Sequence, residues 1–401
     1  MKRLWLIAVA GAVALVAGGF AGSGSSGVSA QAPIPIGALT SLTGPFTAWG
    51  VQVRDGMQFA VNRINAKGGI RGRKLKLVVA DDQSSPNAGI DGFRRLTAQE
   101  HVVAVGGLIS SDVALATTRL AERARIPTFL VKAGASEILT TSSRYTFRTC
   151  LPAAAEVAGP ILQYAQKRKI RRVGAIVADY AWGQAIKSSL EKTFAKARRI
   201  RLRIQVAPVR TSDFTTYLRA LSASNPQLIV ATGHPPGSGA ILAQSGQLGL
   251  TVPVTGAYAP FSAVVKAAGA ATYRRWSDFK CQNVASKAYK ALARRFLRAY
   301  PRDGFFEDDA LAGYAIVNVV AKAIKKVGDD PRKIAAYVHR HAFKIPGYTF
   351  KLSWTAWGEL ARPRIAFDLV TRGPAPRGLN RAGSWYPKQL SISKPLTPYR
   401  P

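Results

Sequence analysis

Short apolar runs alternate along the chain with segments in which apolar residues recur every three or four positions. Such runs are typical of buried strands, and the longer period is typical of amphipathic helices. In the first half, this pattern predicts strands over 34–39, 75–80, 101–105 and 127–131, and helices over 45–66, 86–99 and 113–125. In the second half, it predicts strands over 172–177, 200–207, 228–231 and 252–255, and helices over 186–197, 214–223 and 239–248.

Two consecutive sets of strand–helix alternation predict an α/β fold with two doubly wound parallel-sheet lobes, each with helices on both faces. Long helices are predicted over 287–299 and 311–327. From Gly347 the pattern becomes short and extended, and residues 371–401 are rich in Pro, Gly and basic residues. We expect that last segment to be an irregular tail.

The N-terminal segment 1–32 has the features of an export signal. Lys2 and Arg3 precede an uncharged stretch over 4–20, and small-residue cleavage patterns follow at 28–30 and 30–32. An uncleaved membrane anchor is the alternative, but the stretch is shorter than the roughly 20 residues that a spanning helix prefers. No cysteine near the cleavage region offers a lipid attachment site. The expected location is the periplasm or the outer face of the cytoplasmic membrane.

Composition adds a strong positive charge to this picture. The 401 residues include 57 Lys and Arg against 21 Asp and Glu, for a net charge of +36. The basic residues are spread along the chain without a nucleic-acid-binding module, so we do not expect nucleic acid as a partner. Anionic cell-wall or membrane phosphates, or a general arginine-rich composition, explain the charge better. The expected oligomeric state is a monomer.

No motif of a known catalytic or metal centre accompanies the fold pattern. The glycines after the predicted strands match neither a dinucleotide-binding fingerprint nor a P-loop, and no zinc-protease or nucleophile-elbow motif occurs. The four histidines are scattered, and two cysteines are too few for a four-ligand zinc site. We therefore expect no enzyme activity, no cofactor and no metal.

Several segments, in order, resemble the branched-chain amino-acid-binding branch of the type I periplasmic binding proteins, which serve ABC importers. The most specific piece is the NAKGGI sequence within 60–75. The other matching pieces lie at 39–45, 49–50, 81–82, 106–111, 179–183 and 309–314, and the resemblance covers about 34–369.

The resemblance implies two lobes joined by a hinge of three crossings, with a ligand cleft between them. It places the crossings near Cys150, Cys281 and Pro346. The N-terminal lobe would then comprise 33–150 and 281–345, and the C-terminal lobe 151–280 and 346–370. It also implies a function: an extracytoplasmic protein that captures a small carboxylate-bearing ligand and delivers it to an ABC permease. A ligand-sensing subunit of a membrane receptor is the alternative.

Ser110 and Ser111 are candidate ligand residues because of their place in the chain. They follow the predicted strand 101–105 and the glycines 106–107, and a predicted helix begins directly after them. Helix N-termini carry free N–H groups and partial positive charge, which suits a carboxylate. A plain N-cap is the other interpretation. Ala133, Gly134 and Ser136 resemble the segment whose backbone completes the ligand contacts in the family, and an ordinary small-residue turn is their alternative.

Four further candidates come from the resemblance. Trp49 and Trp182 align with aromatic residues that close over the ligand. A core aromatic is the alternative for each, but both precede a glycine in an expected loop, which favours exposure in the cleft. By the resemblance, His234 and Tyr258 occupy positions at which the amino-acid-binding members of the family have Tyr and Glu, respectively. Without that Glu, a buried ligand ammonium lacks its anionic partner, so an amide or an aromatic carboxylate is a serious rival to an amino acid.

Two further features depend on these expected positions. A replacement anion could come from residues 307–309, for which we favour a solvated acidic helix start. Cys150 and Cys281 fall at two of the expected hinge crossings, so the resemblance permits a disulfide between them. Two buried free thiols are the alternative.

Overall fold

The computed structural model describes residues 32–256, 258–377, 379–380 and 383–401. The predicted export signal therefore lies outside the described residues, apart from Ala32. Within the part of the chain that the structure describes, every helix is too short or too polar to span a bilayer.

The first sheet is wholly parallel, with the strand order β2-β1-β3-β4-β5. Its strands are mostly buried, as expected for a parallel sheet covered on both faces, and the edge strand β2 alternates between buried and more exposed residues. They are β1 (Ile34–Thr40), β2 (Leu75–Asp81), β3 (Val105–Leu108), β4 (Thr128–Leu130) and β5 (Thr146–Arg148). The predicted strand at 101–105 is misplaced, because pairing begins only at Val105 and His101 has a positive φ of 48°.

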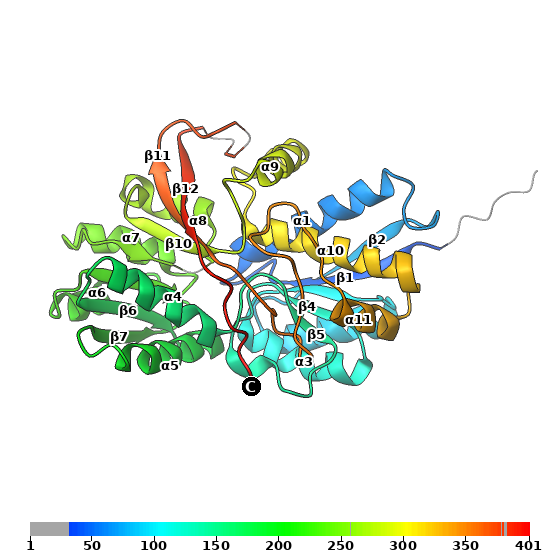
Figure 1. Cartoon of the computed structure of the whole chain (residues 1–401), viewed down its shortest axis with the longest axis horizontal. Helices are drawn as coiled ribbons and strands as arrows, with labels where there is room; N and C mark the ends of the chain where they lie inside the picture. The colour runs from blue at the N-terminus through cyan, green and yellow to red at the C-terminus, as the bar shows by residue number, and fades with distance from the viewer. Residues whose placement is uncertain (1–31, 257, 378, 381–382) are drawn as a thin grey trace, which may run out of the picture. The chain divides into compact units, whose positions relative to one another are not determined.

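Helices cover both faces of this sheet (Figure 1). On one face, α1 (Thr47–Asn65) packs along α10 (Asp308–Val327), so a segment from late in the chain completes the first lobe. The two backbones approach closely at Gly56, where a Cβ atom would lie 1.9 Å from the carbonyl oxygen of Ala310. The other helices of this part are α2 (Pro86–Arg94), which continues as a π-helical turn, α3 (Ser111–Ala124), α9 (Lys287–Ala299) and α11 (Pro331–Arg340).

The second sheet has the order β12-β11-β10-β9-β8-β6-β7, parallel from β10 to β7 and antiparallel at β11 and β12. Its strands are β6 (Arg172–Ala178), β7 (Arg201–Ala207), β8 (Leu228–Gly233), β9 (Val254–Thr255), β10 (Trp276–Lys280), β11 (Ala366–Arg372) and β12 (Trp385–Ile392). Its helices are α4 (Ala154–Lys167), α5 (Ala181–Ala195), α6 (Thr215–Ser222), α7 (Ser238–Gln247) and α8 (Phe261–Ala268). The predicted fold class, two parallel-sheet lobes, is confirmed.

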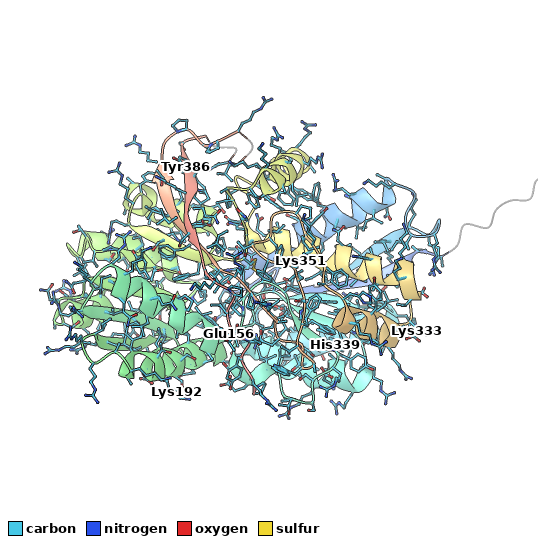
Figure 2. The ribbon with its side chains drawn as sticks, in the orientation of Figure 1. Glu156, Lys192, Lys333, His339, Lys351 and Tyr386 are labelled. Carbon is cyan, nitrogen blue, oxygen red and sulfur yellow. A yellow bond between two sulfur atoms is a disulfide. The ribbon has the colours of Figure 1, made fainter. Side chains whose placement is uncertain are left out.

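The prediction of an irregular tail over 371–401 is wrong for its central part. Residues Trp385–Ile392 form β12, which pairs along β11 and becomes the edge strand of the second sheet (Figure 1; Tyr386 of this strand is labelled in Figure 2). The side chains of this strand alternate only weakly between apolar and polar, and its partner is the equally late strand β11. The periodicity of the tail alone therefore contained little strand signal.

The third lobe crossing is also later than predicted. The segment after Pro346 first pairs with residues at the hinge, where the Thr349 amide donates to the Cys281 carbonyl. It then returns to the first sheet, where the Arg148 amide donates to the Gly358 carbonyl and Trp354 packs on Phe147. Only from Ala366 does the chain join the second sheet. The predicted boundary at 345/346 is therefore wrong for residues 352–360, which pair with Phe343, Phe147 and Arg148 of the first lobe.

Candidate functional site

A small cavity of about 20 Å³ lies where the carboxyl ends of the two parallel sheets face each other. Every residue that lines it follows the end of a strand, which is the position of ligand sites in open α/β sheets. The lining residues are Phe46, Trp49, Ile109, Lys132, Leu151, Tyr180, Trp182, Pro235 and Tyr258.

Aromatic side chains from both lobes meet across this cavity. The Trp49 indole Nε1 donates to the Tyr258 carbonyl over 3.1 Å, and the rings of Phe46 and Tyr180 lie 5.4 Å apart. A further closing contact joins two helix starts, because the Ala181 amide donates to the Asp112 carboxylate over 3.0 Å. A cavity of this size holds roughly one water. The cleft is therefore closed on its own side chains, and a ligand has to displace them.

Lys132 is the charged residue in a lining that is otherwise aromatic or aliphatic. Its Nζ lies 4.7 Å from the centre of the Tyr258 ring, a cation–π arrangement. The same ammonium lies 2.6 Å from Asp308 and 3.4 Å from Asp309, and the side chain is only 5 % exposed. The cleft thus contains a positive charge supplied by the protein itself.

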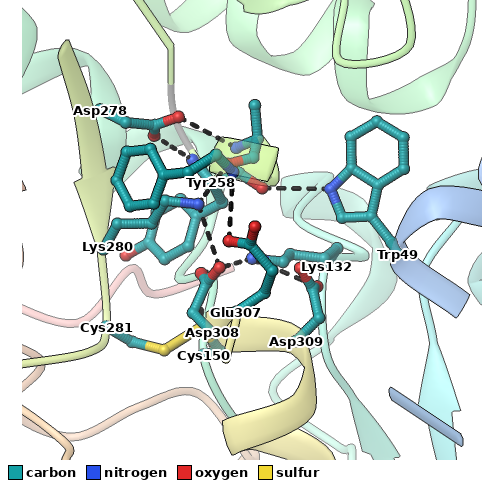
Figure 3. A network of polar contacts seen from close by, with 12 residues as sticks. Trp49, Lys132, Cys150, Tyr258, Asp278, Lys280, Cys281, Glu307, Asp308 and Asp309 are labelled. Atoms are coloured by element: carbon teal, nitrogen blue, oxygen red, sulfur yellow. Dashed lines mark hydrogen bonds and ion pairs between the residues drawn. A yellow bond between two sulfur atoms is a disulfide. The ribbon is translucent and has the colours of Figure 1, made fainter. Parts of the chain in front are cut away.

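Asp308 joins Lys132 to a second buried cation, Lys280, whose Nζ lies 3.0 Å from it (Figure 3). Burial opposes ionisation of Asp308, but the two ammonium groups outweigh it and hold the pKa of this carboxyl below its ordinary value. Burial raises the pKa of Asp309 well above its ordinary range; Lys132 opposes this rise and Asp308 adds to it. Lys132 and Lys280 therefore share the Asp308 carboxylate, and of the two ammonium groups only that of Lys132 also lines the cavity.

Glu307 and Asp278 support the same region through backbone amides. Glu307 accepts from the amides of Phe261 and Ser262 at the start of α8, and Asp278 accepts from those of Tyr258 and Ala259. Burial raises the pKa of Asp278 to about 7, although Lys280 counteracts it. The expectation of a solvated acidic helix start at 307–309 is wrong, because all three carboxylates are fully buried. Their partners, Lys132 and Lys280, lie far away in the sequence.

Comparison with known proteins places this geometry in a family. The family model described as "Periplasmic binding protein" matches residues 33–355. The chain belongs to the periplasmic binding protein family. The relatives found are named as binding proteins and not as enzymes.

Three similar proteins illustrate the range of this periplasmic binding protein family. A Leu/Ile/Val-binding protein homologue from Brucella abortus is 27% identical over 328 residues, which cover 74% of this chain and 78% of that protein. A leucine-binding protein from Thermotoga maritima superposes with a TM-score of 0.77 at 19% identity, covering 90% of this chain and 99% of its own. An ABC transporter solute-binding protein from R. palustris in complex with benzoate has a TM-score of 0.78 at 19% identity, with 92% and 98% coverage.

Among the predicted ligand residues of this periplasmic binding protein, Trp49, Trp182 and Tyr258 line the cavity. Trp182 is anchored by donating its indole N–H to the Thr232 carbonyl over 2.8 Å. Its ring lies so close to Gly134 that a Cβ atom there would be 2.4 Å from it. Tyr258 has a positive φ of 67°, an uncommon conformation for a bulky residue that concentrates at functional sites. Ligand contact by these side chains stays a prediction.

The predicted serine and backbone site lies beside the cavity without lining it. Ser110 is buried at the start of α3, and its neighbour Ser111 accepts a hydrogen bond from the Ala135 amide over 3.2 Å. The carbonyls of Ala133 and Ala135 accept from the Arg148 guanidinium, and Ser136 begins a short 3₁₀ helix. These bonds hold the loop that presents Lys132. A carboxylate contact at Ser110 stays a prediction.

His234 does not line the cavity, contrary to its predicted place in the site. Its Nδ1 accepts from the Gly237 amide over 3.1 Å, and its Nε2 lies 2.9 Å from the Pro208 carbonyl, to which it donates. Both ring nitrogens are therefore used locally, and burial lowers the pKa of this imidazole. His234 stabilises the turn before α7, and its neighbour Pro235 reaches the cavity instead.

Lys132 is the important residue that the sequence reasoning missed. It directly follows the predicted buried strand 127–131 and precedes the small-residue loop 133–136. A lone charge at the carboxyl end of a buried parallel strand is a usable signal, because that end faces the ligand cleft. Tyr180 was likewise missed, although it flanks Trp182.

The hinge beside the site contains a disulfide between Cys150 and Cys281, whose Cα atoms lie 5.4 Å apart (Figure 3). Both residues are fully buried and lie next to Asp308. The bond connects the segment after β5 to the segment after β10. The pairing that the resemblance permitted is thus present in the structure, at the place where the lobes join.

Proposed function

We propose that this protein is an exported solute-binding protein whose ligand is an apolar, aromatic carboxylate, which it delivers to an ABC permease. One observation carries the proposal: five aromatic side chains and a single ammonium group, that of Lys132, converge on the cleft cavity. A benzoate-like ligand presents the complementary pair, a flat apolar ring and one negative charge.

Charge separates this ligand class from free α-amino acids. An α-ammonium group buried in the cleft needs an anionic partner, or it costs several kcal/mol. The cavity lining contains no carboxylate among the described residues, and Tyr258 offers only a hydroxyl and a ring. Lys132 would in addition repel the ammonium. A carboxylate, in contrast, gains a charge-assisted bond to Lys132.

The comparisons are compatible with the delivery role and with an aromatic carboxylate as ligand, but they favour neither an aromatic acid nor an amino acid. The benzoate complex from R. palustris has this fold, and so does the leucine-binding protein from Thermotoga maritima. A ligand-sensing subunit of a membrane receptor is the second candidate. Ligand-dependent binding to the permease, measured with purified permease in lipid nanodiscs, distinguishes transport from sensing.

The test uses three ligands with the same ring: benzoate, benzamide and benzylamine. We expect benzoate to raise the melting temperature, benzamide to do so less, and benzylamine and leucine to leave it unchanged. At 100 times its dissociation constant, a ligand adds about 2.7 kcal/mol of stability. Equal effects of benzoate and benzamide, or a clear effect of leucine alone, would contradict the proposed ligand class.

A matched pair of variants assigns the preference to Lys132. Lys132→Gln and Lys280→Gln each remove one ammonium group from Asp308, but only Lys132 lines the cavity. Both variants are expected to be less stable than the wild type. Only Lys132→Gln is expected to lose the preference for benzoate over benzamide, measured by calorimetry. Retention of that preference would remove Lys132 from the site.

A further inference from the structure

The second lobe has a separate groove of about 450 Å³ between helix α4 and the strands β10, β11 and β12. This volume lies within the roughly 300–1,000 Å³ typical of small-molecule sites. The groove shares no residue with the cleft cavity. Its lining residues are Pro160, Gln163, Tyr164, Lys167, Arg168, Phe279, Ile365, Phe367, Leu390, Ser391, Ile392 and Ser393.

The floor of the groove is a cluster of rings. Phe367 lies 4.9 Å from Phe279 and 4.7 Å from Tyr164, measured between ring centres. Leu390 of β12 adds an apolar side chain that is 41% exposed, one of the two most exposed large apolar residues described. Large apolar side chains that stay open to solvent beside a concave surface mark binding sites more often than isolated ones do.

The charges at the groove are all positive. Lys167 and Arg168 line it from the last turn of α4, and both are exposed. Neither forms an ion pair with a carboxylate of the described residues, and the Arg168 guanidinium lies 5.2 Å from the Tyr164 ring centre. Lys169, Arg171 and Arg172 follow directly in the sequence. No Asp or Glu occurs in the lining.

We propose that this groove is a second binding site, for an anionic amphiphile with one alkyl chain. The chain packs on Phe279, Phe367 and Leu390, and the anionic head lies against Lys167 and Arg168. Such a ligand is either a free long-chain carboxylate or a chain of an anionic membrane lipid. The site is independent of the cleft ligand, and it gives the edge strand β12 a role beyond completing the sheet.

Titration calorimetry and native mass spectrometry with dodecanoate below its micelle concentration test the chemistry. We expect one molecule to bind per chain, and affinity to fall about fourfold for each methylene removed on going to decanoate and octanoate. That factor corresponds to about 0.8 kcal/mol per buried methylene. Dodecyltrimethylammonium is expected not to bind. Saturable binding of this cation with equal affinity, or no saturable binding of either dodecanoate or anionic vesicles, would overturn the proposal.

Two variants and one matched control locate the site. Leu390→Glu places a carboxylate in the groove, and we expect it to weaken dodecanoate binding at least tenfold. Val206→Glu is its control, because Val206 is equally exposed, at 40%, but lies on the opposite edge strand β7. The double change Lys167→Gln and Arg168→Gln should weaken binding by about 2-fold to 30-fold, the range of two exposed ion pairs. Equal loss in Leu390→Glu and Val206→Glu would refute the assignment.

Two further arms separate the sources and the sites. Flotation with vesicles of phosphatidylglycerol, compared with phosphatidylcholine, shows whether the amphiphile is a membrane lipid. In that case Leu390→Glu lowers vesicle binding and Val206→Glu does not. Saturating benzoate is expected to leave the affinity for dodecanoate unchanged. The Lys132→Gln variant is expected to bind dodecanoate as tightly as the wild type. Competition between benzoate and dodecanoate would place dodecanoate in the cleft and overturn the second site. That result would leave the proposed cleft ligand class untouched.

Discussion

Removal of the hinge disulfide tests how the lobes are joined. The double variant Cys150→Ala, Cys281→Ala opens a covalent loop whose ends are 131 positions apart. In the chain-entropy description, closing a loop of this length removes about 5 kcal/mol of conformational freedom from the unfolded chain. Measured effects are commonly smaller, at roughly 2–4 kcal/mol, because the unfolded chain retains structure.

We therefore expect the free energy of unfolding to fall by about 2–5 kcal/mol in urea titrations. For a unit of this size, a loss of about 3 kcal/mol lowers the melting temperature by about 4 °C. The wild type unfolded with dithiothreitol is the control, and it should match the double variant. Ligand affinity should stay within about twofold, because the bond lies at the hinge and leaves the cavity lining intact.

Two results would refute this reasoning. A double variant whose unfolding free energy is within about 1 kcal/mol of the wild type would show that the loop is held by other contacts in the unfolded state. Two titratable thiols in the oxidised, denatured wild type would show that the bond does not form in the mature protein. Intact-mass measurement before and after alkylation distinguishes these cases.

Three further predictions concern packing, pH and the serine at α3. Gly56→Ala should destabilise by roughly 1–3 kcal/mol through overpacking against Ala310. Gly159→Ala, in open space within α4 but directly before Pro160, should change stability by less than about 1 kcal/mol, and an equal loss in both variants would contradict the close-approach argument. Burial raises the pKa of Asp278 to about 7, so the folded state binds the proton more tightly than the unfolded one and stability should fall as pH rises from about 4 to 7. Asp278→Asn should flatten that fall in urea titrations at several pH values, and an unchanged slope would assign it to other carboxyls. Ser110→Ala should weaken benzoate binding by roughly 1–2 kcal/mol in calorimetry if its hydroxyl contacts the carboxylate, and unchanged affinity would remove Ser110 from the site.

Local periodicity was sufficient to predict most of the framework. The strands at 34–39 and 172–177 are mostly apolar and buried because both faces of a parallel sheet are covered, so each run is visible without its partners. The edge strand at 75–80 was visible through its alternation instead. The helix α10 was visible for a different reason, because its apolar residues recur at helical spacing. The resemblance of several segments to a known family then supplied the hinge and the cleft between the two lobes, which periodicity alone does not specify.

Only the tertiary structure decided the chemistry of the cleft. Asp308 and Asp309 look solvated in the sequence, but Lys132, which is 176 positions from Asp308, makes their burial possible. Lys280, 28 positions from Asp308, completes the network. A buried charge is tolerable only beside its partners, and a linear pattern does not show which distant residues become neighbours. The same holds for β12, which forms a strand because β11 offers it a free edge, and for His234, whose ring nitrogens are taken by nearby backbone groups.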